Sequence, residues 1–229
     1  GYTDVARGSA KLMGLDLREN FDRPYQAESP AAFWRRWHMT LSTWLRDYLY
    51  YPLGGSKVAP GRAYFNLWIT FFLIGVWHGA SWTFVLYGAL QATAMVIHRF
   101  VHRMSLKGRR KEELPPDTFA MHAFKVFWCL QFVVFSRILF RAKDIDNAWE
   151  VTLRLFSGTQ SIAQISAGLW AVLIVSFVAH YVPRRWFEEL KVGFQRLPAE
   201  AQGFAAAGVF AGLSLVATSQ VVPYIYFQF

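Results

Sequence analysis

The chain has 229 residues, of which 54% are hydrophobic and 18% aromatic, and its formal net charge is +9. Soluble domains are usually less apolar and less aromatic, which disfavours a soluble enzyme. The basic residues cluster between apolar runs, as in the cytoplasmic loops of membrane proteins, and no zinc-finger, RNP or basic-zipper pattern is present. We therefore expect a protein embedded in the lipid bilayer, without a nucleic-acid partner. Cys129 is the only cysteine, which excludes an intrachain disulfide.

The first 63 residues are expected to lie at the membrane interface. Residues 31–51 form an amphipathic pattern when they are placed at about 100° per residue. A Trp-rich apolar face opposite a basic face is typical of a helix in the headgroup region. His38 falls at the edge of the apolar face, beside Trp34 and Leu45. The apolar face carries Phe33, Trp34, Trp37, Leu41, Trp44, Leu45 and Tyr48, and the polar face carries Arg35, Arg36, Thr43, Arg46 and Asp47.

Five apolar stretches follow a Gly- and Pro-rich loop. The last three have the roughly 20 residues that a bilayer span needs, the second is just long enough, and the first is short. Either the first two form a hairpin that turns at Gly79–Ser81, or the first is a broken helix that ends at His78 inside the membrane. The sequence thus predicts an all-α polytopic membrane protein with about four to five membrane-embedded helices and additional interfacial amphipathic helices. The stretches are Tyr64–Trp77, Ser81–Ile97, Phe119–Phe140, Ser161–Val182 and Phe204–Val222.

The charges between these stretches predict the orientation of the chain. Loop 99–116 is strongly basic, so we expect it in the cytoplasm, and the basic amphipathic segment 184–196 returns to the same side. Residues 30–63 then lie on the cytoplasmic side. The charge-neutral loop after Arg141 and the terminal PYIYFQF fall outside.

The common signatures of soluble enzymes are missing. There is no G-x-S-x-G, Walker A, H-E-x-x-H or dinucleotide motif. All 15 Asp and Glu residues lie outside the apolar stretches, which disfavours glycosidase and di-metal carboxylate chemistry. His98 and His102 have a spacing that could share a metal, but no further ligand is near them in sequence, so we expect interfacial polar residues and no metal site. His122 and His180 lie near the ends of their stretches, where polar groups reach water.

His78 lies in the segment GVWHGASW, at the end of the first apolar stretch. Ionisable residues inside a membrane are rare and usually functional. The neighbouring Gly75 and Gly79 allow another backbone or a substrate to approach, and Gly79 allows the helix to stop beside the ring. His38 is either an interfacial histidine or a second functional group. Arg137, with Lys125 and Gln131, could line a polar cavity, although Arg137 is close enough to the end of its stretch to reach water, and we interpret it first as structural.

A buried histidine without a nucleophilic Ser or Cys partner can act as a general base, because its unperturbed pKa of ~6.5 suits removal of a hydroxyl proton. A second histidine could bind the acceptor or the developing oxyanion. These residues leave three functions open. The chain could transfer an acyl group to a hydroxyl, it could be a proton-coupled transporter that uses His78 as a relay, or it could be a non-catalytic docking component. The absence of membrane-embedded carboxylates disfavours the transporter.

Two long segments, FWRRWHMTLSTWLRDYLYYPLGG and NLWITFFLIGVWHGASWTFVLYG, narrow this choice. With GYTDVARGSAKLMGLDLRENFDRPY and SRILFRAKD, they resemble the membrane-bound O-acyltransferase (MBOAT) family. The likeness is greatest to its bacterial branch, which contains alginate O-acetyltransferase and the teichoic-acid D-alanyl transferase. The resemblance implies that His78 is the active-site histidine and that His38 is its partner. Trp34, Trp37, Trp77, Gly75, Gly79 and Arg46 are then candidates to line the substrate channel.

The resemblance also implies the substrates and the location. Acetyl-CoA or an acyl-carrier thioester would arrive from the cytoplasm as the acyl donor, with no bound cofactor. The acceptor would be an alginate-like cell-envelope polysaccharide, presented through periplasmic partner proteins, or alternatively teichoic acid or peptidoglycan. The location would be the bacterial inner membrane. Family members are considerably longer, so we expect a single membrane-embedded domain that forms the C-terminal half of an MBOAT protein: 1–63 interfacial, 64–101 the active-site helix pair, and 119–229 the C-terminal helices.

Overall fold

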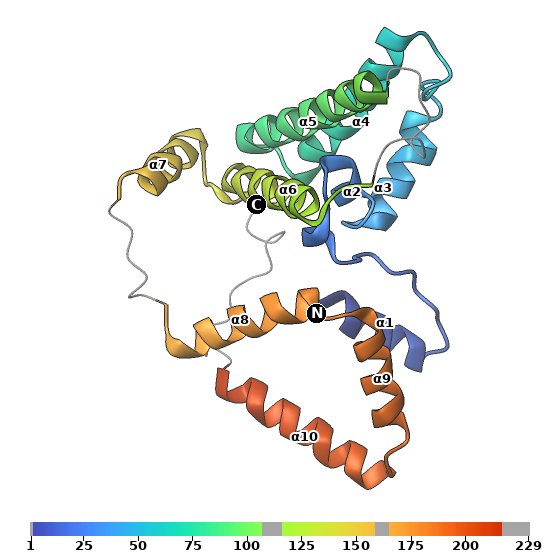
Figure 1. The fold of residues 1–229 in the computed structure, drawn as a ribbon, viewed down its shortest axis with the longest axis vertical. Coiled ribbons are helices and arrows are strands. Elements are labelled where there is room, and N and C mark those ends of the chain that lie inside the picture. Colours follow the sequence, from blue (N-terminus) through green and yellow to red (C-terminus); the bar gives the residue numbers. More distant parts are fainter. Residues whose placement is uncertain (1, 107–115, 159–164, 217–229) are drawn as a thin grey trace. The chain divides into compact units, whose positions relative to one another are not determined.

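The structure is a computed structural model that describes residues 2–106, 116–158 and 165–216 (Figure 1). These residues form helices and loops without a strand, as the all-α prediction requires, and one isolated backbone bridge joins Phe21 to Trp37. The chain divides into two compact units, Gly1–Thr159 and Gln160–Phe229. The expected segments 1–63 and 64–101 lie in the first unit, whereas the expected segment 119–229 is divided between the two.

The N-terminal part of the first unit consists of short helices, and the single helix predicted for residues 31–51 is wrong. One helix ends at Trp34, and the next begins only after His38, whose backbone is left-handed (φ 47°, ψ 54°). Residues 20–22 take up backbone groups that a continuous helix would use. The amide of Met39 donates to the carbonyl of Asn20, and the amide of Asp22 donates to the carbonyl of Arg36. The elements are α1 (Tyr2–Leu12), the 3-10 helix η1 (Pro24–Gln26), α2 (Pro30–Trp34), α3 (Met39–Leu45) and the π-helix η2 (Arg46–Tyr50).

Helices α4 (Pro60–His78) and α5 (Trp82–Leu106) form an antiparallel hairpin, which is the first of the two alternatives for the Gly79–Ser81 region. The two helices cross where Gly75 faces Gly88, and a Cβ atom on either glycine would collide with the backbone of the other helix. Farther from the turn, Trp68 Nε1 donates a hydrogen bond of 3.2 Å to Thr93 Oγ1. His78 is therefore the last residue of α4, immediately before the turn.

Helix α6 (Phe119–Arg141) coincides with the third apolar stretch and packs on α5. The Thr118 hydroxyl accepts a hydrogen bond from the amide of Met121 and caps its N-terminus, a contact worth about 1 kcal/mol. Helix α7 (Ile145–Phe156) follows, in a loop that the sequence did not predict to be helical. Its signals were present: Asp144 caps its first turn, and its apolar residues recur with helical spacing.

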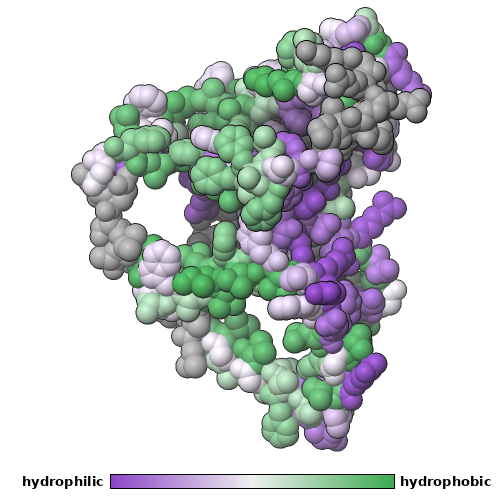
Figure 2. Space-filling view, viewed as in Figure 1, coloured by the Kyte–Doolittle hydropathy of each residue, from purple (hydrophilic) through white to green (hydrophobic). Residues whose placement is uncertain are grey.

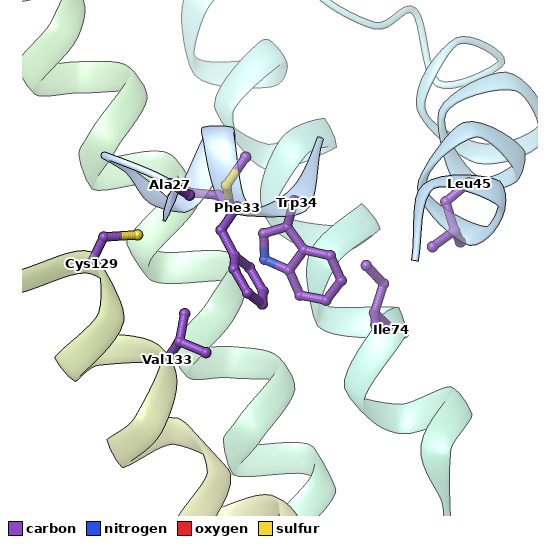
Figure 3. Close-up of a cluster of buried hydrophobic side chains, with 8 residues drawn as sticks. Ala27, Phe33, Trp34, Leu45, Ile74, Cys129 and Val133 are labelled. Carbon is purple, nitrogen blue, oxygen red and sulfur yellow. The ribbon is translucent and has the colours of Figure 1, made fainter. Parts of the chain in front are cut away.

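The core of the first unit forms where the short helix α2 lies against α4, α5 and α6 (Figure 3). Phe33 points toward Cys129 and Val133 on α6, and Trp34 points toward Ile74 on α4. Both aromatic rings are buried. Helix α2 thereby holds the residues that follow it, including His38, against the three long helices.

The second unit contains α8 (Ala167–Tyr181), α9 (Arg184–Gln195) and α10 (Ala199–Val216). Helix α8 begins after the N-cap residue Ser166. The start of the predicted stretch Ser161–Val182 and the end of Phe204–Val222 lie outside the described residues. The terminal PYIYFQF and residues 107–115 of the expected basic loop 99–116 lie outside them as well, whereas residues 99–106 of that loop belong to α5.

Among the described residues, α5 and α6 are each long and apolar enough to cross a membrane. Helices α8 and α9 pass the same criterion as one bent pair, with an angle of 104° between them. Figure 2 shows hydrophobic side chains over the part of the first unit where α5, α6 and α7 lie. Large apolar side chains such as Ile97 and Phe127 are more than half exposed there, as expected for surfaces that face lipid.

Candidate active site

His78 lies in an aromatic surround at the closed end of the α4–α5 hairpin. The centre of its ring is 4.8 Å from that of Phe140 on α6, and 6.0 and 6.4 Å from those of Phe84 and Tyr87 on α5. The imidazole is half-buried. Gly79 follows it with an extended backbone, and a Cβ at this position would lie only 2.8 Å from the Phe84 ring. Three helices thus determine where the imidazole lies.

His38 occupies the junction between α2 and α3. Its left-handed backbone conformation is uncommon for a residue with a Cβ atom. Its Nδ1 atom is buried and has no hydrogen-bond partner among the described residues. Burial lowers the pKa of His38 below its usual value, because the charged imidazolium is poorly solvated there. His38 is therefore neutral at pH 7.

The structure brings His38, His78 and Arg137 together. The charges of Arg137 and of a protonated His38 both lie within electrostatic range of the His78 ring. These residues come from three separate parts of the chain, namely the α2–α3 junction, the end of α4 and the last two turns of α6. The two histidines singled out from the sequence therefore lie near one another and form one candidate site.

Arg137 joins this site through two aromatic rings. Its guanidinium carbon lies 4.6 Å from the centre of the Trp37 ring and 5.4 Å from that of Phe140. Cation–π contacts of this kind contribute about 0.5–2 kcal/mol, with the higher values where water is excluded. The Nη2 atom is buried and has no hydrogen-bond partner among the residues described. Arg137 thus directs a cationic donor group into the protein.

A chain of buried hydrogen bonds joins the helices that carry the site. Trp34 Nε1 donates to Gln91 Oε1 (3.2 Å), and Gln91 Nε2 donates to Ser136 Oγ (3.0 Å). Ser136 in turn donates to the carbonyl of Val133 (2.7 Å). This network links α2, α5 and α6, and it places Ser136 next to Arg137 in the chain. Gln91 and Ser136 were missed by the sequence analysis; the only signal was a polar residue within each apolar stretch.

The predicted channel residues have different surroundings. Trp34 is buried in the core, and Trp37 is half-buried with its ring stacked on Phe33 at 5.6 Å. Trp77 is 59% exposed. The space beside Gly75 is filled by the backbone of α5, and that beside Gly79 by Phe84. At Gly75 the structure thus shows the close approach of another backbone, which is one of the two expectations stated for these glycines.

Arg46, the last of these candidates, lies at a pocket of about 200 Å³ between α3, η2 and α4. Its side chain is exposed and pairs with Asp47 at 2.8 Å. One end of the pocket reaches Ile74, which lies one helical turn before His78. The pocket is lined by Ser42, Leu45, Arg46, Tyr50, Leu67, Thr70, Phe71 and Ile74.

The chemistry available to this site is proton transfer and the binding of oxygen atoms. Two imidazoles can accept or donate protons, and one guanidinium can donate hydrogen bonds to a negative oxygen. Helices α4, α5 and α6 contain no Asp or Glu. Within the described ranges no three His, Cys, Asp or Glu side chains group as metal ligands, and His98 and His102 have ring centres 6.0 Å apart on α5.

Comparison with known proteins identifies the family of the chain. The model of the membrane-bound O-acyltransferase family matches residues 1–141, which include every residue of the site. The chain belongs to the membrane-bound O-acyltransferase family. It is accordingly a membrane protein, and the resemblance found in the sequence is confirmed.

Similar MBOAT relatives come from several bacteria. A probable alginate O-acetylase of Azotobacter vinelandii is 34% identical over 97% of this chain and 44% of its own length. A probable alginate O-acetylase of Pseudomonas aeruginosa is 36% identical over 82% of this chain and 34% of its own. A peptidoglycan O-acetyltransferase of Helicobacter pylori is 37% identical over 66% of this chain and 27% of its own. The chain thus spans less than half the length of these relatives.

Proposed function

We propose that this chain forms part of an O-acyltransferase that acetylates hydroxyl groups of a cell-envelope polysaccharide. The observation that carries the proposal is the convergence of His78, His38 and Arg137 in a chain of the MBOAT family. The relatives from Azotobacter and Pseudomonas, named for alginate O-acetylation, favour an alginate-like acceptor.

In the proposed reaction His78 is the general base. It removes the proton of an acceptor hydroxyl while that oxygen attacks the carbonyl of an acyl thioester, either acetyl-CoA or an acyl-carrier thioester. A positioned base of this kind typically contributes ~10²–10⁴-fold to the rate. Because the pKa of His38 is lowered by burial, the neutral ring offers one donor and one acceptor nitrogen, which suits binding of the acceptor hydroxyl.

The setting of the reaction is also part of the proposal. The donor arrives from the cytoplasm, the acceptor is reached from the other side with the help of periplasmic partner proteins, and the membrane is the bacterial inner membrane. The pocket beside Arg46 is a candidate to receive part of a substrate, since one of its lining residues, Ile74, lies one helical turn before His78. Trp34, Trp37 and Trp77 remain candidates for the walls of the substrate channel in the whole protein.

The proposal is tested by substitution in the whole protein in its own bacterium. His78→Ala is expected to abolish O-acetyl esters on the envelope polysaccharide, measured by mass spectrometry of purified glycans, and His38→Ala to reduce them strongly. His98→Ala is the matched control, because this histidine lies on α5 outside the site. Wild-type acetylation by His78→Ala would overturn the mechanism. Silent His78 and His38 variants, combined with normal acetylation by the wild type, would instead favour a docking role.

A second acceptor is favoured by the Helicobacter pylori relative, which is named for peptidoglycan O-acetylation. The same mass spectrometry separates the two cases when it is applied to muropeptides and to exopolysaccharide from one culture. Esters confined to muropeptides would assign the peptidoglycan acceptor and leave the role of His78 unchanged.

A further inference from the structure

Arg137 is the charged residue beside His78 that the general-base mechanism does not use. It lies in α6, which among the described helices is one of two with the length and composition of a membrane span. A cation in such a segment is costly, and it normally either reaches the headgroups or serves a function inside. Arg141 lies one turn further toward the helix end and is exposed, whereas the Nη2 atom of Arg137 is buried. The two arginines of α6 therefore have different environments.

The aromatic contacts of Arg137 leave its hydrogen-bond donors available. A guanidinium is planar, and its N–H groups all point outward in that plane. Trp37 and Phe140 interact with it through their ring faces, so they hold the cation without accepting its hydrogen bonds in the way a carboxylate would. The Phe140 ring also lies 4.8 Å from the His78 ring, so one aromatic side chain touches both groups.

We propose that Arg137 is a catalytic residue that binds the oxyanion formed during acyl transfer beside His78. This inference rests on the proposed function, because it requires an acyl carbonyl at His78. Charge that develops only in the transition state is stabilised most effectively by donors that are already in place and shielded from water. The partnerless buried Nη2 atom meets that requirement.

The step balances as follows. The acceptor oxygen forms a bond to the thioester carbonyl carbon, and its proton passes to His78. The carbonyl π electrons move to the carbonyl oxygen, which becomes the oxyanion that Arg137 binds. When the carbonyl re-forms, the C–S bond breaks, and the leaving thiolate takes the proton from His78. The products are the ester and the free thiol, and Arg137 remains charged throughout.

Two other roles for Arg137 give different results. A carboxylate on an acidic sugar could be its partner, in which case substitution would weaken binding of the acceptor rather than the chemical step. A purely structural role would lower the amount of folded protein rather than its turnover. Kinetic constants expressed per folded molecule separate these cases.

The experiment uses the whole protein in membranes, with an acetyl thioester and a polysaccharide acceptor. Arg137→Gln is expected to lower kcat about 100-fold with little change in either KM, and Arg137→Lys to recover part of the loss. Added guanidinium ions should partly rescue Arg137→Ala. The matched controls are Arg141→Gln, which removes the neighbouring arginine, and Lys125→Gln on the same helix; both should keep wild-type kcat.

The proposal is overturned if kcat of Arg137→Gln stays within about threefold of wild type, or if the whole effect appears in the acceptor KM. It is also overturned if neither the Gln nor the Lys variant accumulates in the membrane. The His78→Ala variant in the same assay keeps the two proposals distinct. If His78→Ala is inactive while Arg137→Gln transfers normally, only the role of Arg137 falls; if His78→Ala transfers normally, the proposed function falls as well.

Discussion

The guanidinium carbon of Arg137 lies 4.6 Å from the centre of the Trp37 ring. The positive charge on α6 is thus in contact with the residue that immediately precedes His38. The same Trp37 ring stacks on Phe33 and meets Phe21 edge-on at 4.8 Å. The side chain therefore connects the core, the N-terminal loop and the site. Its position makes the placement of Arg137 and that of His38 depend on each other.

Replacing Trp37 tests this connection. Trp37→Leu should move the guanidinium of Arg137 and lower acyl transfer roughly two- to thirtyfold, because the loss of the ring face removes about 0.5–2 kcal/mol of cation–π contact. Trp37→Phe keeps a ring face and should retain most of the transfer. The measurement is kcat per folded molecule in membranes. Equal rates for the Leu and Phe variants would contradict the role assigned to the ring.

Gly75→Ala should destabilise the α4–α5 hairpin by several kcal/mol, because its methyl group would collide with the backbone of α5 at Phe84 and Gly88. Gly61→Ala is the matched control. Gly61 lies in the first turn of the same helix, and a Cβ there meets nothing within 4 Å. Thermal unfolding in detergent, followed by tryptophan fluorescence, should show a large fall for Gly75→Ala and none for Gly61→Ala. A stable Gly75→Ala protein would show that the two helices can separate freely.

Gln91→Leu should cost about 1–3 kcal/mol, because it leaves Trp34 Nε1 and Ser136 Oγ without their buried partner. If these bonds form one network, the double variant Gln91→Leu with Trp34→Phe should lose less than the sum of the two single losses. Denaturation of the four proteins measures the difference. Strict additivity would mean that the two side chains do not cooperate.

His38→Gly should separate the backbone role of this residue from its chemistry. Glycine adopts the left-handed conformation at His38 without steric cost, so the free energy of unfolding should stay within about 1 kcal/mol of wild type while transfer falls sharply. Arg23→Gly is the control, because Arg23 has the same positive φ of 47° but lies outside the site. It should remain both stable and active. If His38→Gly transfers the acyl group at the wild-type rate, the role of His38 is confined to its backbone conformation.

Hydropathy was sufficient to predict α6 and the presence of two apolar segments at α4 and α5. It did not decide between a hairpin and a broken helix, and it did not predict that α5 continues to Leu106. It failed for residues 31–51, where periodicity predicted one helix. The break at His38 depends on hydrogen bonds to Asn20 and Asp22, which local sequence does not encode. Trp44 and Tyr48 of that apolar face are more than half exposed, so they do not belong to the protein core.

The site itself was predictable only in part. His78 could be singled out because an imidazole beside glycines in an apolar run has few structural explanations. Arg137 was visible as a charge in a span, but its direction depends on Trp37 and Phe140, which come from different parts of the chain. The partnership of Gln91 with Ser136 requires the packing of α5 on α6, so no pattern within either helix reveals it.

The contact between Gly75 and Gly88 has a mechanical consequence for His78. It lies less than one turn before the imidazole, whereas near the other end the two helices are joined by side chains, such as the Arg99 guanidinium 5.7 Å from the centre of the Tyr64 ring. Backbone contacts yield less than long side chains do. The glycine crossing therefore holds the end of the hairpin that carries His78 more tightly than its open end, and the imidazole keeps its place relative to α5.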